Sequence, residues 1–315
     1  MKILITGISG FVGNNLVKAL HDKYELIGLD LNDNPISGVS AIYTWEDLAN
    51  GKLPQNIDAI IHLAGKAHDV KNASGAEVYF QVNTELTKKI YDYFLLSSAS
   101  KFIFFSSVKA AADFVPGDIL TEDVVPNPVG PYGESKIKAE EYLLSNMSQP
   151  GKEVVILRPC MIHGPGNKGN LNLLYNVIRK GIPWPLGKFE NRRSFTSVGN
   201  LTFALDKMLT MPIDSGIYHI GDDKALSTNE LIAVMCGAME RKSRIWKLPK
   251  WSINSMAKLG TWLHLPLTKE RLTKLTENYV VSNNKLKKAL KIDEMPISAE
   301  EGLIATIKSF ENINK

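Results

Sequence analysis

Tyr132 and Lys136 carry side chains that could move a proton, and they stand four residues apart in the segment PYGESK. This spacing places two side chains on one face of a helix. A phenol has a pKa of about 10, and a cation held beside it would lower that pKa towards neutrality. Such a tyrosine could exchange a proton with an alcohol while a hydride moves at the same carbon. The pair alone is common, so other parts of the chain must support it.

A pair of serines, Ser106 and Ser107, follows the apolar run at residues 102–105. Ligands of a parallel sheet bind beyond the carboxyl ends of its strands. We predict that Ser107 hydrogen-bonds the same substrate oxygen as Tyr132 and that Ser106 contacts a cofactor. Ser107, Tyr132 and Lys136 then make up the predicted catalytic group.

A glycine-rich turn, TGISGFVG, connects the apolar run at residues 2–6 to a helical pattern. Its spacing is GxxGxxG rather than GxGxxG. In a dinucleotide site one glycine permits the tight turn, a second lets the pyrophosphate approach the backbone, and a third lets helix and strand pack closely. The helix start then offers N–H groups to the phosphates. We predict cofactor contacts from Gly7, Gly10, Phe11, Val12 and Gly13.

Asp30 closes the second apolar run, residues 25–29, where a carboxylate that binds ribose is expected. A carboxylate there accepts hydrogen bonds from the 2′- and 3′-hydroxyls and repels a 2′-phosphate. Residues 31–37 contain no Arg or Lys that could compensate. The sequence therefore favours NAD over NADP.

The order of the predicted elements indicates an α/β fold: a doubly wound parallel sheet of the Rossmann type, with a smaller, mostly helical C-terminal substrate lobe. Residues 1–163 are expected to form the NAD-binding domain, completed by about 195–221, and residues 164–194 and 222–315 the lobe. Strands are predicted at 2–6, 25–29, 58–63, 102–105, 154–157 (stopped by Pro159) and 217–220. Helices are predicted at 13–23, 83–97, 132–143, 172–179 and 228–239, and over most of 250–315 with breaks near Pro266 and Pro296.

Composition narrows the function classes. The 315 residues have a net charge of +4 and no basic stripe, which argues against nucleic acid as a partner. The two cysteines, Cys160 and Cys236, are far apart, so we expect reduced thiols and no metal site. Neither a signal peptide nor an uninterrupted apolar run of about 18 residues is found. These features predict a cytoplasmic protein without a membrane span.

Residues 251–265 have apolar side chains at helical spacing: Ile253, Met256, Leu259 and Leu263. Such a helix could lie on a membrane surface. Packing of the helix on the lobe is the favoured interpretation, since we expect few cations beside it.

The motifs together resemble the extended short-chain dehydrogenase/reductase family, and within it the NAD-dependent epimerase/dehydratases of nucleotide sugars that are similar to UDP-glucose 4-epimerase. The resemblance covers almost the whole chain. It is carried by TGISGFVG, Asp30, IIHLAGKAHD, FFSSVKAA, PYGESKIKAE, LRPCMIHGPG, the GNL of residues 169–171, and RRSFTSVGNL.

The resemblance implies further site residues. Asp47 and Leu48 would flank the adenine, and Asn83 would lie beside the strand-end serines. The cofactor would also be lined by Leu63, Ala64, Gly65 and Pro159. The substrate would meet Ser107, Lys109, Met161, Asn170, Leu171 and, at its diphosphate, Arg193.

Three functions remain open. The first is a 4-epimerase of a UDP-hexose or UDP-N-acetylhexosamine, of the kind linked to surface polysaccharide. The second is an NAD(P)H-dependent 4-ketoreductase of a UDP-4-keto-6-deoxy-N-acetylhexosamine, and the third is a non-catalytic dinucleotide sensor. The sequence departs from many 4-epimerases at Met161 and at residues 108–112, which weakens epimerisation but leaves hydride transfer untouched. A dehydratase is disfavoured because Val108 and Lys109 supply no carboxylate. Family membership implies a homodimer that pairs through helices near 83–98 and 132–147.

Overall fold

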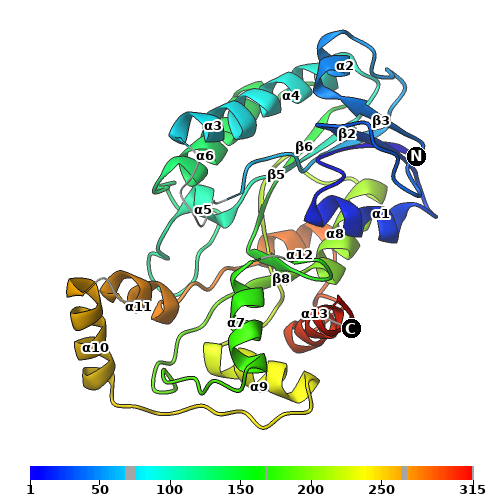
Figure 1. The fold of residues 1–315 in the computed structure, drawn as a ribbon. Coiled ribbons are helices and arrows are strands. Elements are labelled where there is room, and N and C mark those ends of the chain that lie inside the picture. The colour runs from blue at the N-terminus through cyan, green and yellow to red at the C-terminus, as the bar shows by residue number, and fades with distance from the viewer. Residues whose placement is uncertain (68–74, 168, 264–267, 314–315) are drawn as a thin grey trace.

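Seven parallel strands form the central sheet of the protein, in the order β3-β2-β1-β4-β5-β6-β9 (Figure 1). The computed structural model describes residues 1–67, 75–167, 169–263 and 268–313. The predicted fold class is confirmed, because helices cover both faces of this sheet. The strands are β1 (Lys2–Thr6), β2 (Glu25–Asp30), β3 (Ala41–Thr44), β4 (Ala59–His62), β5 (Lys101–Phe105), β6 (Glu153–Pro159) and β9 (Gly216–Ile220).

The strands are buried on both faces, which explains their nearly continuous apolar sequences. Side chains alternate between the two faces along each strand. Ile3 and Ile5 of β1 therefore enter one core cluster, whereas Leu4 enters the other.

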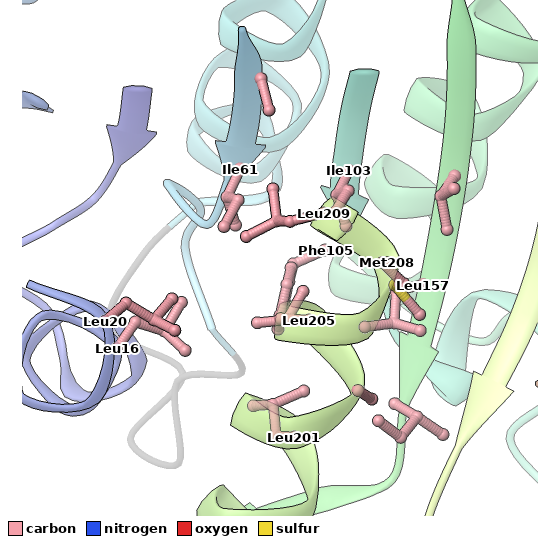
Figure 2. Close-up of a cluster of buried hydrophobic side chains, with 14 of the residues drawn as sticks. Leu16, Leu20, Ile61, Ile103, Phe105, Leu157, Leu201, Leu205, Met208 and Leu209 are labelled. Carbon is pink, nitrogen blue, oxygen red and sulfur yellow. The ribbon is translucent and has the colours of Figure 1, made fainter. Parts of the chain in front are cut away.

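One core layer lies between the sheet and the helices α1, α8 and α12 (Asn284–Leu290). Figure 2 shows Leu209 of α8 beside Ile61 and Ile103 of the sheet, and Leu16 and Leu20 of α1 belong to the same cluster. The opposite layer holds α4 and α6. The Rossmann helices are α1 (Phe11–Leu20), α2 (Trp45–Ala49), α3 (Ala76–Phe80), the π-helical turn η1 (Gln81–Glu85), α4 (Leu86–Leu96), α5 (Val108–Ala111), α6 (Pro131–Asn146) and α8 (Val198–Thr210).

The lobe is built from short elements that follow β6. Among its described residues are β7 (Met161–His163), β8 (Phe195–Ser197), α7 (Asn170–Arg179), α9 (Thr228–Ala238), α10 (Lys250–Trp262), α11 (Lys269–Thr276), α12 (Asn284–Leu290) and α13 (Ala299–Ile313). The helix α9 begins at a reciprocal capping box formed by Ser227 and Glu230. Within the described residues, no helix is both long and apolar enough to cross a bilayer.

Several element predictions need correction. Pro159 does not stop β6 but is its last residue and pairs with Ile220. The single helix predicted at 83–97 is the end of a run made of α3, η1 and α4. The pattern gave no sign of β3, α2, β7, β8 or α8. Pro266 lies outside the described residues, while Pro296 falls between α12 and α13 as predicted.

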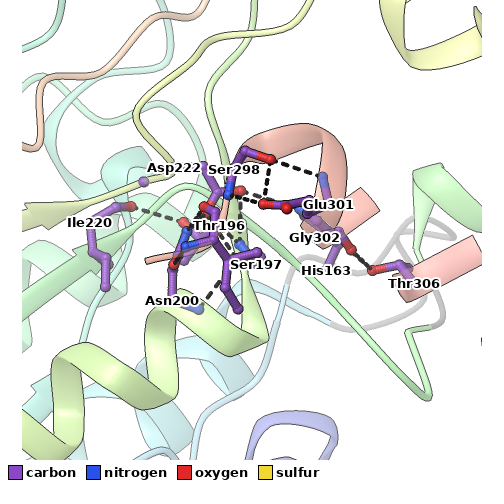
Figure 3. A network of polar contacts seen from close by, with 12 residues as sticks. His163, Thr196, Ser197, Asn200, Ile220, Asp222, Ser298, Glu301, Gly302 and Thr306 are labelled. Carbon is purple, nitrogen blue, oxygen red and sulfur yellow. Dashed lines mark hydrogen bonds and ion pairs between the residues drawn. The ribbon is translucent and has the colours of Figure 1, made fainter. Parts of the chain in front are cut away.

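A buried polar network around Asp222 joins the lobe to the Rossmann layer (Figure 3). The Asp222 carboxylate accepts hydrogen bonds from the Ser197 backbone N–H at 3.1 Å and from Asn200 Nδ2 at 2.6 Å. His163 Nε2 lies 3.5 Å away, and its Nδ1 bonds to Thr306 of α13 at 2.9 Å. The C-terminal helix is thereby fastened to the strand that follows the sheet.

Replacing Asp222 by alanine is expected to destabilise the protein by about 3–5 kcal/mol, because several buried donors lose their only charged acceptor. Thermal or urea unfolding measures the change. Asp214→Ala is the matched control: this exposed aspartate accepts a hydrogen bond from Tyr218 through its backbone carbonyl, which the substitution keeps, so the change should stay within about 0.5 kcal/mol. Equal stability of the two variants would contradict the assigned role of the network.

Candidate active site

The glycine turn between β1 and α1 leaves no room for side chains. Gly7 has a φ of +68°, and a Cβ there would lie 2.9 Å from the backbone of Ala64. A Cβ on Gly13 would lie 2.3 Å from the Ile8 carbonyl oxygen. The N-cap residue of α1, Gly10, supplies no side-chain cap. The helix start thus fits a diphosphate held by backbone N–H groups.

Asp30 stands at the end of β2 and is tied to this turn. Its carboxylate accepts hydrogen bonds from the backbone N–H of Ser9 at 2.9 Å and from the Ser9 hydroxyl at 2.6 Å. The other oxygen accepts from the Leu31 N–H at 2.8 Å. A carboxylate has about four acceptor positions. Asp30 can therefore hold the turn and still accept a ribose hydroxyl.

Asp47 and Leu48 lie on α2, beyond β3. The Asp47 carboxylate is used by a capping box with Thr44 and by Lys52 at 2.9 Å. The backbone N–H of Thr44, followed by the Lys52 hydrogen bond, lowers the pKa of Asp47 to about 2. Leu48 packs against the core beneath the helix. Their contact with adenine stays a prediction.

The predicted catalytic side chains of Ser107 and Tyr132 meet at the carboxyl edge of the sheet. Ser107 follows β5 and caps α5, while Tyr132 is the second residue of α6. Burial raises the pKa of Tyr132, the hydrogen bond with the Ser107 side chain lowers it, and Tyr79 also raises it. The Tyr79 ring meets the Tyr132 ring edge-on with centroids 6.5 Å apart.

Lys136 lies one helical turn beyond Tyr132, and the pKa of the phenol is raised by burial, whereas the sequence predicts a lowered pKa. Its Nζ donates a hydrogen bond to the Phe105 carbonyl at 2.7 Å. A Cβ on Gly65 would lie 3.0 Å from the same Nζ. Burial, partly offset by the Glu140 carboxylate, lowers the pKa of Lys136 to about 8. The predicted lowering of the Tyr132 pKa is wrong in this structure, because burial of the phenol is the largest effect and raises this pKa.

A buried chain of hydrogen bonds runs through His62, the last residue of β4. The Ala64 N–H donates to Thr6 Oγ1 at 3.0 Å, and Thr6 Oγ1 lies 2.6 Å from His62 Nδ1. His62 Nε2 lies 2.9 Å from Thr87 Oγ1, which donates to the Asn83 carbonyl at 2.7 Å. Since the Thr87 proton is used for Asn83, this hydroxyl must accept from Nε2–H, and Nδ1 must accept from Thr6. Burial and the charge of Lys136 lower the pKa of His62, which fits this neutral tautomer.

Asn83 lies in the π-helical turn and joins three segments. Its Oδ1 accepts from the Lys66 N–H at 2.7 Å, and its Nδ2 donates to the Lys66 carbonyl at 3.1 Å and to Ser135 Oγ at 2.9 Å. Ser135 Oγ in turn donates to the Tyr132 carbonyl at 2.9 Å. Sequence reasoning missed Ser135 and the role of His62. The strand position of His62 was its only signal.

Ser106 does not face the same way as Ser107. Its hydroxyl donates to Glu140, and Glu140 forms a fully buried ion pair with Arg158. Since the hydroxyl of Ser106 already has this internal acceptor, a cofactor contact by its side chain stays a prediction. The Arg158 and Glu140 charges lie inside the junction of β6 and α6.

Two predicted substrate residues hold carboxylates of this chain. Arg193 Nη2 lies 3.0 Å from Glu277 Oε1, and Lys109 Nζ lies 2.9 Å from Asp113 Oδ1. Lys109 also lies over the ring of Tyr279, 4.6 Å from its centroid. The Tyr279 hydroxyl donates to the Ala112 carbonyl at 2.7 Å, so this group reaches α5 and its cap Ser107. The sequence carried no signal for Glu277 as the partner of Arg193.

The other predicted residues lie on several different elements. Leu63, Ala64 and Gly65 follow β4, and Pro159 ends β6. Met161 starts β7 and is 37% exposed. Asn170 begins α7, whereas the Leu171 side chain is buried in the lobe core. His68 and Asp69 of the IIHLAGKAHD motif lie outside the described residues. Across the part of the chain that the structure describes, no three His, Cys, Asp or Glu side chains gather as metal ligands would.

Comparisons with known proteins show the family to which the chain is similar. Residues 3–221 match the family described as the NAD dependent epimerase/dehydratase family. The chain is 32% identical to a UDP-glucose 4-epimerase of Vibrio cholerae, over 82% of each chain. It is 26% identical to the N-acetyl-alpha-D-glucosaminyl-diphospho-ditrans,octacis-undecaprenol 4-epimerase of Escherichia coli O157:H7, over 91% of this chain and 85% of that one. The fold is similar to that of UDP-glucose 4-epimerase from Thermotoga maritima with UDP-glucose, with a TM-score of 0.77, 21% identity and full coverage of both chains.

The low pKa of Lys136 predicts a measurable cost of burial. At pH 7 the lysine is charged when folded and unfolded, and a pKa of about 8 against an ordinary 10.5 corresponds to roughly 3 kcal/mol. Between these values the unfolded chain binds more protons, so this cost fades as pH rises. Lys136→Met is therefore expected to unfold at higher urea concentration than the parent protein at pH 7, with a smaller advantage at pH 10.

The control for this prediction is Lys138→Met, two residues along α6. Lys138 is exposed and pairs with Glu141 at 2.7 Å. Its replacement should change stability by less than about 1 kcal/mol at either pH. A Lys136→Met variant less stable than the parent at pH 7 would show that the ammonium stabilises the fold.

Proposed function

The chain belongs to the NAD dependent epimerase/dehydratase family, and we propose that it is a 4-epimerase of a UDP-hexose or UDP-N-acetylhexosamine. In broader terms it is an NAD-dependent enzyme of nucleotide sugars. The observation that carries the proposal is the hydrogen bond between Ser107 and Tyr132 at the carboxyl edge of the sheet, with Lys136 one turn along the same helix.

The residues of this edge would divide the acid–base work. Tyr132 takes the proton of the C4 hydroxyl and later returns it, while Ser107 hydrogen-bonds the same oxygen. Bound NAD would supply the hydride chemistry at C4, in both directions. The 4-keto sugar formed in between turns over in the pocket, so that its other face is reduced. Because burial raises the pKa of Tyr132, the charge of Lys136 would have to act on the phenol during turnover.

The cofactor would be held by features already described. The glycine turn would receive the diphosphate of NAD, and Asp30 would bind its adenosine ribose. Gly65 and Lys136 would contact the part of the cofactor nearest to Tyr132. The tight packing of Gly7 against Ala64 supports this, since any side chain at Gly7 would push the turn away from β4. NADP would meet repulsion between its 2′-phosphate and Asp30.

We propose that residues 164–194 and 222–315 form the substrate lobe and that Arg193 binds the sugar nucleotide's diphosphate. A guanidinium fork matches phosphate oxygens. Glu277 now accepts from this guanidinium, so the diphosphate would have to displace it. Homodimerisation through α4 and α6 and a cytoplasmic location complete the proposal.

A 4-ketoreductase is the second candidate, favoured by Met161 and by the segment from Val108 to Ala112 where many 4-epimerases have other residues. The same side chains would then perform one half of the reaction. NADH would supply the hydride, Tyr132 the proton, and the spent cofactor would leave after each turnover.

Incubation with UDP-glucose, UDP-GlcNAc and a UDP-4-keto-6-deoxy-HexNAc, with and without NADH, distinguishes the two functions. A 4-epimerase should interconvert the C4 epimers of UDP-glucose or UDP-GlcNAc without added NADH, as measured by chromatography or NMR. Stoichiometric NADH consumption with the keto sugar alone would reject epimerisation and support the reductase. No turnover with any of the three would reject both substrate assignments.

Tyr132→Phe should lower kcat by at least about 10²-fold, because the ring remains but its proton donor and acceptor is lost. NAD binding, measured by calorimetry, should be retained. Tyr79→Phe serves as the control, because the Tyr79 ring lies edge-on to Tyr132 and the proposed mechanism assigns no proton transfer to it. Full activity of Tyr132→Phe would remove this tyrosine from the mechanism.

A further inference from the structure

One segment of the lobe, residues 241–269, is strongly basic. It contains seven Lys or Arg residues and neither Asp nor Glu. Since the whole chain has a net charge of +4, the remaining residues together have a net charge of −3. The small overall charge therefore conceals a local excess of cations. The expectation that residues 251–265 have few cations beside them is wrong, because Lys247, Lys250, Lys258 and Lys269 all lie in or next to them.

The same segment holds three of the five tryptophans of the chain, and all three are more than half exposed. Trp246 is 55%, Trp251 73% and Trp262 75% exposed. Trp251 and Trp262 are eleven residues apart on α10, which is close to three helical turns, so they project from the same side of the helix. Leu259 lies between them and is 51% exposed.

The opposite side of α10 is firmly packed. Ile253 and Ala257 are buried in a cluster with Leu186 and Leu272. The sequence prediction that Ile253, Met256, Leu259 and Leu263 form the packing side is therefore correct only for Ile253. Because these core contacts fix the rotation of the helix, Trp251 and Trp262 must face outward.

Figure 1 shows α10 at the outer end of the lobe, beside α11 and far from the sheet. The indole ring prefers the headgroup region of a bilayer, where its ring is shielded and its N–H remains hydrated. Cations next to such rings attract anionic headgroups. A patch that combines exposed indole rings with cations has the features that favour binding to an anionic bilayer surface.

We propose that this α10 surface, defined as Trp246, Trp251, Lys258, Leu259 and Trp262, binds the surface of an anionic lipid bilayer. The helix lies parallel to the membrane, with its tryptophans at headgroup level and its lysines against lipid phosphates. A second copy of this chain fits poorly, because a symmetric contact would bring like charges together. The exposed Leu259 has no counterpart on a nucleic-acid backbone.

The proposed docking bears on the active site through α11. This helix packs against α10 and leads to Glu277, the partner of Arg193. Membrane contact would therefore hold the predicted diphosphate region close to the lipid surface. The proposal does not depend on the identity of the sugar.

Vesicle flotation of the full chain tests it. The protein is expected to float with vesicles of phosphatidylglycerol and phosphatidylethanolamine, to bind phosphatidylcholine vesicles at least about tenfold more weakly, and to be released by 0.5 M salt, roughly as screening requires. Trp251→Ser/Trp262→Ser should reduce binding by about tenfold or more. Lys258→Glu should reduce it by about tenfold, since it reverses a charge at the contact.

Matched controls distinguish binding by the α10 surface from nonspecific binding of the protein to vesicles. Leu96→Ser/Val125→Ser removes two side chains that are each 83% exposed elsewhere, and Lys308→Glu reverses an exposed charge on α13. Both controls should bind vesicles like the parent protein, and unfolding temperatures should confirm that all variants are folded. Absence of parent binding to anionic vesicles would overturn the proposal. So would equal binding by the tryptophan variant, or self-association that depends on the same tryptophans without vesicle binding.

Discussion

The carboxyl edge of the sheet, where Ser107 and Tyr132 meet, depends on the buried hydrogen-bond chain through His62. Each link has one donor and one acceptor, and the direction is set at both ends by backbone groups of Ala64 and Asn83. Reversing a single link would leave two buried groups facing each other with like roles, at a cost comparable to a lost hydrogen bond. The π-helical turn, the loop after β4 and the start of α6 consequently share one geometry. Tyr132 is positioned by this shared geometry as much as by its own helix.

A second constraint is that the cations predicted to lie near the substrate already have partners within this chain. Lys136, Arg193 and Lys109 each interact with an oxygen of this chain. Such pairs keep cations in place without leaving them unpaired in partly buried surroundings. If Arg193 and Lys109 bind the nucleotide sugar as proposed, its binding requires these side chains to rearrange.

Much of the sheet and of the cofactor edge could be predicted from the sequence, because local chemistry encodes them. The strands at residues 2–6 and 102–105 are short apolar runs, and the turn of Gly7 to Gly13 needs glycine for steric reasons that spacing reveals. Other features arise from contacts between distant segments. The pairing of Arg193 with Glu277 and the packing side of α10 depend on tertiary structure, which no periodicity records. The pKa of Tyr132 was mispredicted for the same reason, since burial is a property of the folded chain.

The bond between His163 and Thr306 joins residues 143 positions apart. During synthesis, at about 5–20 residues per second, the segment around His163 must wait roughly 7–30 s before its partner has been made. The strands β1 to β6 are complete by then, while the polar groups around Asp222 still lack the helix that covers them. Once β9 and Asp222 have also been made, the nascent chain has all the strands of its sheet, but the polar groups around Asp222 stay uncovered until α13 follows.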